Sequence, residues 1–468
     1  PAPGLPARHS GGREAGTPAH SPRLPTPHTY TAMTAIRSNL LLKLLAPLVA
    51  FGVTLALLVS FGGGRELELP ERSAGAPVDI SPDASTDQRI AVLQRALRDG
   101  SGSAGGYASL GDAYLQKARE TGDPGYYTRA ERGFDAALRR DSRNVSAVLG
   151  AGTLAGLRHD FGEQLRLGLE ARRLMPGLVS PYPVIADAQI ELGRYAAAER
   201  TLQRLLDRKP NLTAYSRVSY YRELRGDLDG AVESMRLAAS AGAGAPENLA
   251  YVQVLLGDLE LQRGQTGAAR LAYTAALRSL PGYPAGMVGL ARADAASGDL
   301  GRAAARLRRA SARLPLTGTL TLLAQTERAL GRPAAATAAL DGARAQQQLY
   351  MAAATEPDAE TVLFEADYGD PQRAVTLGRQ VWKRAPSIRS ADALAWAHVR
   401  AGEPGAGVSW ARRALRTGSR DPLFNLHAAV ALERAGRIGQ ADRHYDVARR
   451  GRAALSPSAA ALLEEGLR

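Results

Sequence analysis

Hydrophobic and polar positions between residues 87 and 455 recur with helical spacing. After the turn at Gly226, the small or apolar residues Ala231, Met235 and Ala238 follow one another at intervals of four and three, with polar residues between them. This spacing puts the three side chains on one face of a helix. The pattern predicts an all-α chain.

The same turn comes back along the chain, and an alanine follows most of its copies by five residues. We expect glycine to end the first helix of each unit in the left-handed conformation, and a proline to start the next unit. No single helix pair can bury its apolar face, so about ten pairs must stack on one another. The turns begin at Gly122, His159, Gly193, Gly226, Gly264, Gly298, Gly331, Gly369, Gly402 and Gly436, and the prolines are Pro176, Pro210, Pro281, Pro315 and Pro386.

In period, small-residue positions and closing proline, residues 87–455 resemble the tetratricopeptide repeat (TPR) family. The resemblance implies a right-handed α–α superhelix, a TPR solenoid, whose first helices line a concave groove that binds proteins. Tyr107, Tyr182 and Tyr215 stand in places where the family has tryptophan, and the repeats near Gly369 and Gly402 match least well.

Helices are also expected at both ends of the solenoid. The amphipathic stretch from residue 87 to 97 predicts an N-terminal cap. Residues 456–468 predict a C-terminal capping helix, with Ser456 as N-cap and Pro457 as its first residue.

The N-terminal part has a different pattern. Residues 1–32 are rich in proline, and we expect them to be disordered and the natural chain to start at Met33. A basic segment, 33–43, precedes an uncharged apolar run, 44–61, which is ~27 Å long as a helix. The charges predict a single transmembrane helix with its N-terminus inside and the repeats outside the cytoplasmic membrane. A cleaved signal sequence, which would give a secreted protein, is the alternative, and 62–86 is expected to be a flexible linker.

Composition narrows the function. There is no cysteine, which rules out disulfides and thiolate metal sites. The net charge is +13, and nearly all of the basic residues are arginines, since only four are lysines. An excess of arginine, alanine and glycine is typical of GC-rich, actinobacterial-like genomes, and we expect an exported bacterial member of the family. The sequence lacks a phosphate loop, a nucleophile elbow and a paired-histidine motif, so we expect no enzyme activity, no cofactor and no metal site.

Arginines cluster late in the second helices, where they complement the helix dipole. We expect a solvated outer face there, or a surface for anionic envelope polymers or lipids. Nucleic acid is not expected as a partner, because stacking aromatic residues do not alternate with the basic ones.

The family's concave positions, carried onto this sequence, predict a partner groove. Its first half is acidic and partly apolar, its second half is basic, and the sign changes near Arg292. We expect exposed Tyr and Trp side chains beside charges to bind an extended protein or peptide, with simple solvation as the alternative. The groove residues are Asp187, Ile190, Glu191, Tyr220, Glu223, Tyr251, Val254, Asp258, Leu261, Arg292, Arg328, Arg389, Trp396 and Arg400.

The sequence therefore predicts a membrane-anchored scaffold without enzyme activity. A non-catalytic subunit of an envelope enzyme or transporter complex is the alternative.

Overall fold

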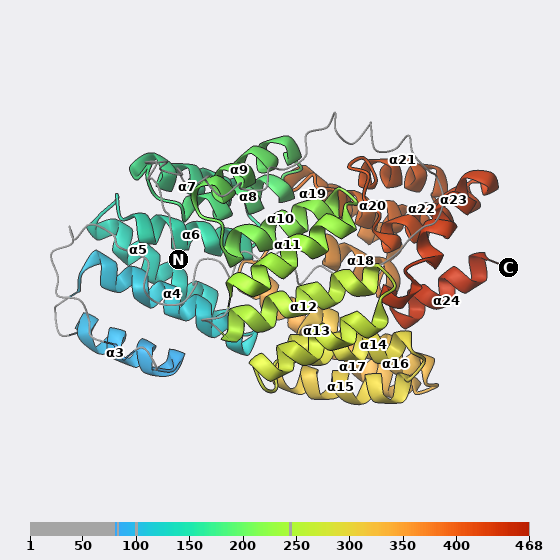
Figure 1. Ribbon diagram of the computed structural model, residues 1–468, viewed down its shortest axis with the longest axis horizontal. Coiled ribbons are helices and arrows are strands. Elements are labelled where there is room, and N and C mark those ends of the chain that lie inside the picture. Colours follow the sequence, from blue (N-terminus) through green and yellow to red (C-terminus); the bar gives the residue numbers. More distant parts are fainter. Residues whose placement is uncertain (1–79, 82–83, 99–101, 243–245, 468) are drawn as a thin grey trace, which may run out of the picture.

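The computed structural model describes residues 80–81, 84–98, 102–242 and 246–467, which form twenty-two α-helices and no strand (Figure 1). The expected all-α fold is confirmed for this part of the chain. No helix within these ranges has the length and apolar character needed to cross a membrane. The predicted disordered segment, basic segment and transmembrane run (1–61) lie outside the described residues, as does most of the predicted linker.

Ten antiparallel helix pairs follow one another, as the turn spacing predicted. The first helices of the pairs are α4 (Ala104–Thr121), α6 (Val145–Leu157), α8 (Pro181–Glu191), α10 (Leu212–Leu224), α12 (Pro246–Gln262), α14 (Pro284–Ala296), α16 (Thr317–Ala329), α18 (Ala359–Tyr368), α20 (Ile388–Arg400) and α22 (Pro422–Arg434). The second helices are α5 (Gly125–Arg140), α7 (Phe161–Leu174), α9 (Tyr195–Arg208), α11 (Leu228–Ala241), α13 (Thr266–Ser279), α15 (Leu300–Arg313), α17 (Pro333–Ala352), α19 (Pro371–Arg384), α21 (Pro404–Ala414) and α23 (Ile438–Arg449).

The two sets of helices form an inner and an outer layer. First helices such as α8, α12, α20 and α22 are buried along most of their length, because other first helices and their own second helices surround them. Each second helix buries one face against its neighbours and exposes the opposite face to solvent. The alanines five residues after the turns, such as Ala198, Ala231 and Ala269, have no exposed surface, so the two helices of a pair can approach closely.

The turn chemistry is as predicted, with one exception. Gly122, Gly193, Gly226, Gly264, Gly298, Gly331, Gly402 and Gly436 all have positive φ, and His159 takes their place with a φ of 62°. The prediction is wrong for Gly369, whose φ is −127°. There the side chain of Asp370 caps the next helix, and α18 ends without a left-handed residue.

The prediction that the closing prolines start the next helix is wrong. Pro210 and Pro386 lie in the loops, and the helices after them start behind the side-chain caps Asn211 and Ser387. Other prolines occupy the first helical position, among them Pro284 in α14 and Pro422 in α22.

Both end helices are present. α3 (Thr86–Arg98) packs on α4, and α24 (Pro457–Gly466) begins with Ser456 as its N-cap. α24 packs on α22 and α23, its neighbours in sequence, and also on α16. A short 3-10 helix, Arg452–Ala454, packs on α12 and α14. The C-terminal end therefore contacts helices much earlier in the chain (Figure 1).

The solenoid winds until its later repeats lie on its earlier ones. The backbone N–H of Ile388 donates to the Tyr195 hydroxyl at 2.8 Å, and the Thr417 hydroxyl donates to the Leu224 carbonyl at 2.6 Å. Gln346 donates to the Gly122 carbonyl at 2.9 Å. These pairs are 193 to 224 residues apart, roughly six repeats. In Figure 1 the green helix α10 accordingly lies beside α20.

Candidate partner-binding interior

The first helices determine where the predicted groove residues lie. Capping fixes the start of these helices: the side chain of Asn211 accepts the N–H of Ala214 in α10, and Ser387 accepts that of Ser390 in α20. The residues that follow the caps then face the inside of the solenoid or the neighbouring first helices.

Eight of the fourteen predicted groove residues are buried: Asp187, Ile190, Tyr251, Val254, Asp258, Leu261, Arg292 and Trp396. The expectation of exposed aromatic side chains is therefore wrong for Tyr251 and Trp396, which are only 3% and 4% exposed. The tight winding of the solenoid brings first helices together and covers these positions. Four residues are partly buried (Glu191, Tyr220, Glu223 and Arg389), and Arg328 and Arg400 are exposed.

The buried charges of this set form ion pairs between consecutive first helices. Arg217 of α10 donates to both carboxylate oxygens of Asp187 in α8, at 2.8 and 2.7 Å. Arg292 of α14 donates to Asp258 of α12, which also accepts the Tyr273 hydroxyl at 2.6 Å. Burial raises the pKa of Asp187 and Asp258, and the neighbouring arginines oppose that shift. These two carboxylates hold repeats together and are not open groove positions.

A similar ladder joins the last first helices. Trp396 of α20 donates its indole N–H to Asp367 of α18 at 2.9 Å and stacks on His427 of α22. The imidazole of His427 lies 3.0 Å from Asp392 of α20. Trp396 is therefore part of a contact between repeats.

The two halves of the predicted groove meet at one place, which we call the junction cluster and define as Glu191, Tyr220, Glu223, Glu360 and Arg389. Arg389 of α20 donates to the Tyr220 hydroxyl of α10 at 3.2 Å, across the contact between early and late repeats. The predicted change from an acidic to a basic half at Arg292 is wrong, because Arg292 pairs with Asp258 and Arg389 lies among the carboxylates of the early repeats.

Desolvation dominates the electrostatics of the junction cluster. Burial raises the pKa of Glu223 to about 7, against the opposing effects of Gln262 and Arg389. Burial, together with the charge of Asp358, raises the pKa of Glu360 to about 8, and burial also raises that of Glu191. The three carboxyl groups thus share the Arg389 guanidinium in a region that disfavours negative charge.

A small cleft opens beside this cluster, between α7–α8 and the start of α18 and α20. His159, Glu191, Asp358 and Arg389 line it, and its volume of about 40 Å³ holds a few water molecules. His159 Nδ1 lies 2.7 Å from the Glu356 carbonyl oxygen, and Nε2 lies 4.0 Å from Asp358. The sequence placed His159 only as a turn residue. The sequence did not predict the contact of His159 with the late repeats, because this contact depends on how the whole solenoid winds.

Within the described residues, no group of three or more histidine or acidic side chains could hold a metal ion. His398 lies 2.7 Å from Glu403 of the following turn, and His444 lies 2.8 Å from the Asn425 side chain. Both histidines join neighbouring elements.

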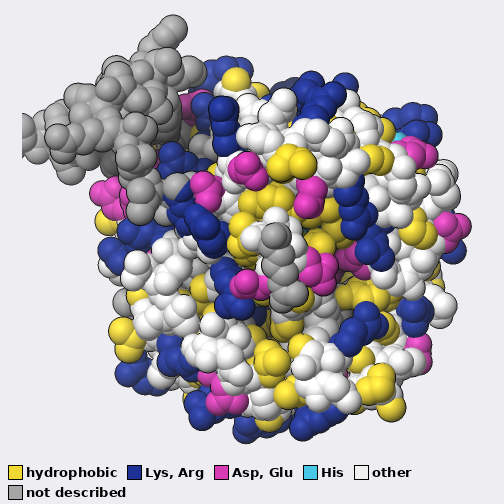
Figure 2. All heavy atoms as spheres, turned by 90° about the vertical axis from the view of Figure 1, so that its right-hand side faces the viewer, with side chains coloured by type: hydrophobic (Ala, Val, Ile, Leu, Met, Phe, Trp, Pro, Cys, Tyr) yellow, Lys and Arg dark blue, Asp and Glu magenta, His cyan; other side chains and the backbone are white. Residues whose placement is uncertain are grey.

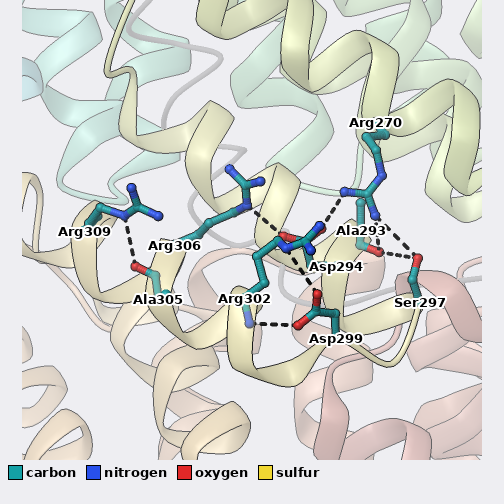
Figure 3. A network of polar contacts seen from close by, with 9 residues as sticks. All are labelled: Arg270, Ala293, Asp294, Ser297, Asp299, Arg302, Ala305, Arg306 and Arg309. Atoms are coloured by element: carbon teal, nitrogen blue, oxygen red, sulfur yellow. Dashed lines mark hydrogen bonds and ion pairs between the residues drawn. The ribbon is translucent and has the colours of Figure 1, made fainter.

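On the outer layer, several second-helix arginines do more than face solvent. Arg270 of α13 and Arg306 of α15 converge from two sides on Asp294 of α14, which is 1% exposed (Figure 3). Arg308 pairs in the same way with the buried Glu327 of α16. The expectation of a simply solvated outer face is wrong for these arginines.

The end of the molecule at the right of Figure 1 has a mixed character. Hydrophobic side chains gather near the middle of this face, and acidic and basic side chains lie around them (Figure 2). This end therefore offers an amphipathic surface.

Comparison with known proteins agrees with the repeat architecture. Residues 184–246, which span α8 to α11, match the tetratricopeptide repeat family. The match covers two of the ten helix pairs. No curated protein matches the chain significantly.

Solved structures that match the chain have low sequence identity and TM-scores below 0.5. A chain of the APC/C hetero-tetramer Cut9–Hcn1 is 14% identical, with 82% of this chain and 93% of that chain covered and a TM-score of 0.35. The human IFIT1 dimer with PPP-AAAA is 15% identical, with coverages of 71% and 79% and a TM-score of 0.44. BtubC from P. vanneervenii is 20% identical, with coverages of 44% and 91% and a TM-score of 0.33.

Proposed function

We propose that the chain is a scaffold without enzyme activity that binds a protein or peptide partner at the junction cluster. One observation carries the proposal: Glu191, Glu223 and Glu360 share the Arg389 guanidinium in a partly buried region, and burial raises the pKa of all three carboxyl groups. An arginine or lysine side chain from a partner would stabilise the ionised form of these carboxyl groups, which burial disfavours, and would pair with them where desolvation strengthens the attraction. Tyr220, which is partly accessible, adds an aromatic surface of the kind that binding hot spots favour.

The partner proposed for this site is an extended segment with a basic side chain at Glu223. The exposed Arg328 lies on the later first helix α16, where it would pair with an acidic part of the same segment, whereas Arg400 already pairs with Asp367 of α18 at 3.5 Å. The buried pairs Asp187–Arg217 and Asp258–Arg292 would hold the repeats in register around it.

The proposed location is the outer side of the cytoplasmic membrane. It is supported by the apolar run 44–61, the basic residues before it and the acidic residues after it. A chain cleaved after this run would be secreted, and a subunit of an envelope enzyme or transporter complex would use the same surface. Alkaline phosphatase activity in a C-terminal fusion would support the outer location. Fluorescence from a C-terminal fusion to green fluorescent protein would refute it.

Site-specific crosslinking tests the binding site. The full chain, with a photoreactive phenylalanine in place of Tyr220, is irradiated in its own membranes, and adducts are identified by mass spectrometry. The double substitution Glu191→Gln/Glu223→Gln should abolish the adduct. The control Asp135→Asn/Asp442→Asn changes two exposed carboxylates on second helices and should retain it.

Two results would contradict the proposal. One is equal loss of the adduct in both double variants. The other is the same adduct from a photoreactive residue at the exposed Arg309 of the outer layer but none from position 220.

A further inference from the structure

Two tryptophans contact each other on the outer layer, in surroundings that differ chemically from the carboxyl-rich junction cluster. Trp382 of α19 and Trp410 of α21 have ring centroids 4.9 Å apart in an edge-to-face arrangement, and both remain partly exposed. The chain has three tryptophans, and the third, Trp396, is buried. Trp382 and Trp410 both pack against the core with part of each ring, and the rest of the two rings remains exposed.

Two arginines contact the pair, and three further cations are exposed on the same helices. Arg413 lies over the Trp410 ring with its guanidinium carbon 4.6 Å from the centroid, and Arg416 lies 5.7 Å from that of Trp382. Arg379, Lys383 and Arg412 are exposed on the same two helices. We call these seven residues the tryptophan–arginine face.

Acidic side chains are missing from these helices. Neither α19 nor α21 contains an aspartate or glutamate. The ion pairs of α19 involve Arg373 with Glu365 and Arg384 with Glu356, so within the described residues Arg379, Lys383 and Arg412 have no ion-pair partner. Glu403, just before α21, lies against His398. The outer arginines of α13 and α15 compensate buried carboxylates, but these cations do not.

The side chains of this face can donate hydrogen bonds but not accept them. Arginine, lysine and the tryptophan indole have N–H groups and no acceptor atom. A fitting partner therefore presents many acceptors and negative charge. Tryptophan prefers the boundary between lipid headgroups and acyl chains, and arginine binds headgroup phosphates while its stem lies along apolar surface.

We infer that the tryptophan–arginine face binds the phosphate headgroups of an anionic bilayer and lays the late repeats against the membrane. The inference rests on the proposed function only in placing the repeats beside a membrane. Its chemistry needs an anionic lipid surface and no particular anchor.

The test separates this contact from any anchor. The full chain is held in a phosphatidylcholine nanodisc and titrated with vesicles of equal parts phosphatidylcholine and phosphatidylglycerol, brominated near the headgroup. Quenching of tryptophan fluorescence reports contact. The run 44–61 contains no tryptophan, so the signal comes from the repeats alone. If the chain does not insert into the nanodisc, the anchor proposal fails and the same titration is done on the free chain.

Vesicles with phosphatidylglycerol should quench the fluorescence, and vesicles of phosphatidylcholine alone should not. The substitutions Arg379→Gln, Lys383→Gln and Arg412→Gln together should weaken vesicle binding roughly 100-fold. All three side chains are exposed, and an unchanged helical circular dichroism spectrum should confirm that the fold persists. The control Arg139→Gln, Arg200→Gln and Arg204→Gln removes three exposed cations from α5 and α9 and should leave binding unchanged.

Equal weakening in both triple variants would overturn the inference, because net charge alone would then explain binding. Binding of a single-stranded oligonucleotide at equal phosphate concentration, without binding of vesicles, would also overturn it and point to a nucleic acid partner.

Discussion

At the scale of single residues, a buried polar group four positions before the turn glycine recurs through the solenoid. Asp294, Glu327, Glu260 and His398 all occupy this position and are at most 3% exposed. Arginines from flanking helices, or Glu403 in the case of His398, supply their partners. A buried charge is tolerated only when it is paired in this way. The outer arginines therefore have a structural role in several repeats.

Substitutions around Asp294 should show an asymmetric cost. Removing Arg270 and Arg306 together leaves a buried carboxylate without a counter-charge, which costs about 3–5 kcal/mol. Asp294→Asn should cost less, because both arginines are partly exposed and can be hydrated. Urea unfolding of the three proteins would measure this. If the Asp294→Asn variant is less stable than the double arginine variant, the unpaired buried carboxylate is not the main source of the cost.

The pKa values of the junction cluster predict that the fold is less stable at alkaline pH. The folded-state pKa of Glu223, about 7, lies above its ordinary value of 4.5, so the folded state binds this proton more tightly than the unfolded state does. Its contribution is complete below pH 4.5 and is lost as the pH rises through 7. The same holds for Glu360 up to pH 8. Scanning calorimetry should give a higher midpoint at pH 5 than at pH 8.5.

The variant Glu223→Gln/Glu360→Gln should reduce this difference between the two midpoints. A variant with the same pH dependence as the original chain would contradict the assignment of these protons.

At the scale of elements, local chemistry made the helices predictable. The left-handed glycines such as Gly226, the alanines that follow them and the caps Ser456–Pro457 are short-range features, and each is present as expected. The misses have local causes too. Gly369 fails because the side chain of Asp370 caps the next helix, and Pro210 and Pro386 fail because Asn211 and Ser387 take over as caps.

The C-terminal helix shows where local reasoning ends. Its cap was predictable, but its contact with α16 was not, because that contact depends on how far the repeats wind. Removing residues 456–468 should therefore increase hydrogen exchange in α22 and α23 and also in α16. Removing α3 should affect α4 and little else, since α3 packs mainly on α4. If exchange in α16 is unchanged after the C-terminal truncation, the contact contributes no stability.

At the scale of the whole molecule, contacts between early and late repeats decide what the interior can do. In an open solenoid each repeat contacts only its neighbours. Here Arg389 reaches Tyr220, and Ile388 reaches Tyr195. The family's groove positions were assigned as if the solenoid were open. The sequence therefore identified residues such as Glu223 and Arg389 but placed them in opposite halves of the groove. Repeat spacing does not report the winding, because small differences in the angle between pairs accumulate over ten repeats.

The contact between the windings can be tested at turn glycines. Gly226 and Gly298 both have positive φ, 76° and 85°, so alanine at either position incurs a strain of about 1–2 kcal/mol. They differ in their surroundings. A Cβ atom at Gly226 would lie 2.3 Å from the Gly418 carbonyl oxygen of the late repeats, whereas one at Gly298 would meet nothing within 4 Å. Gly226→Ala should therefore lose more stability than Gly298→Ala, and X-ray scattering should show a larger radius of gyration only for Gly226→Ala. Equal losses and unchanged radii in both variants would mean that early and late repeats do not press on each other in solution.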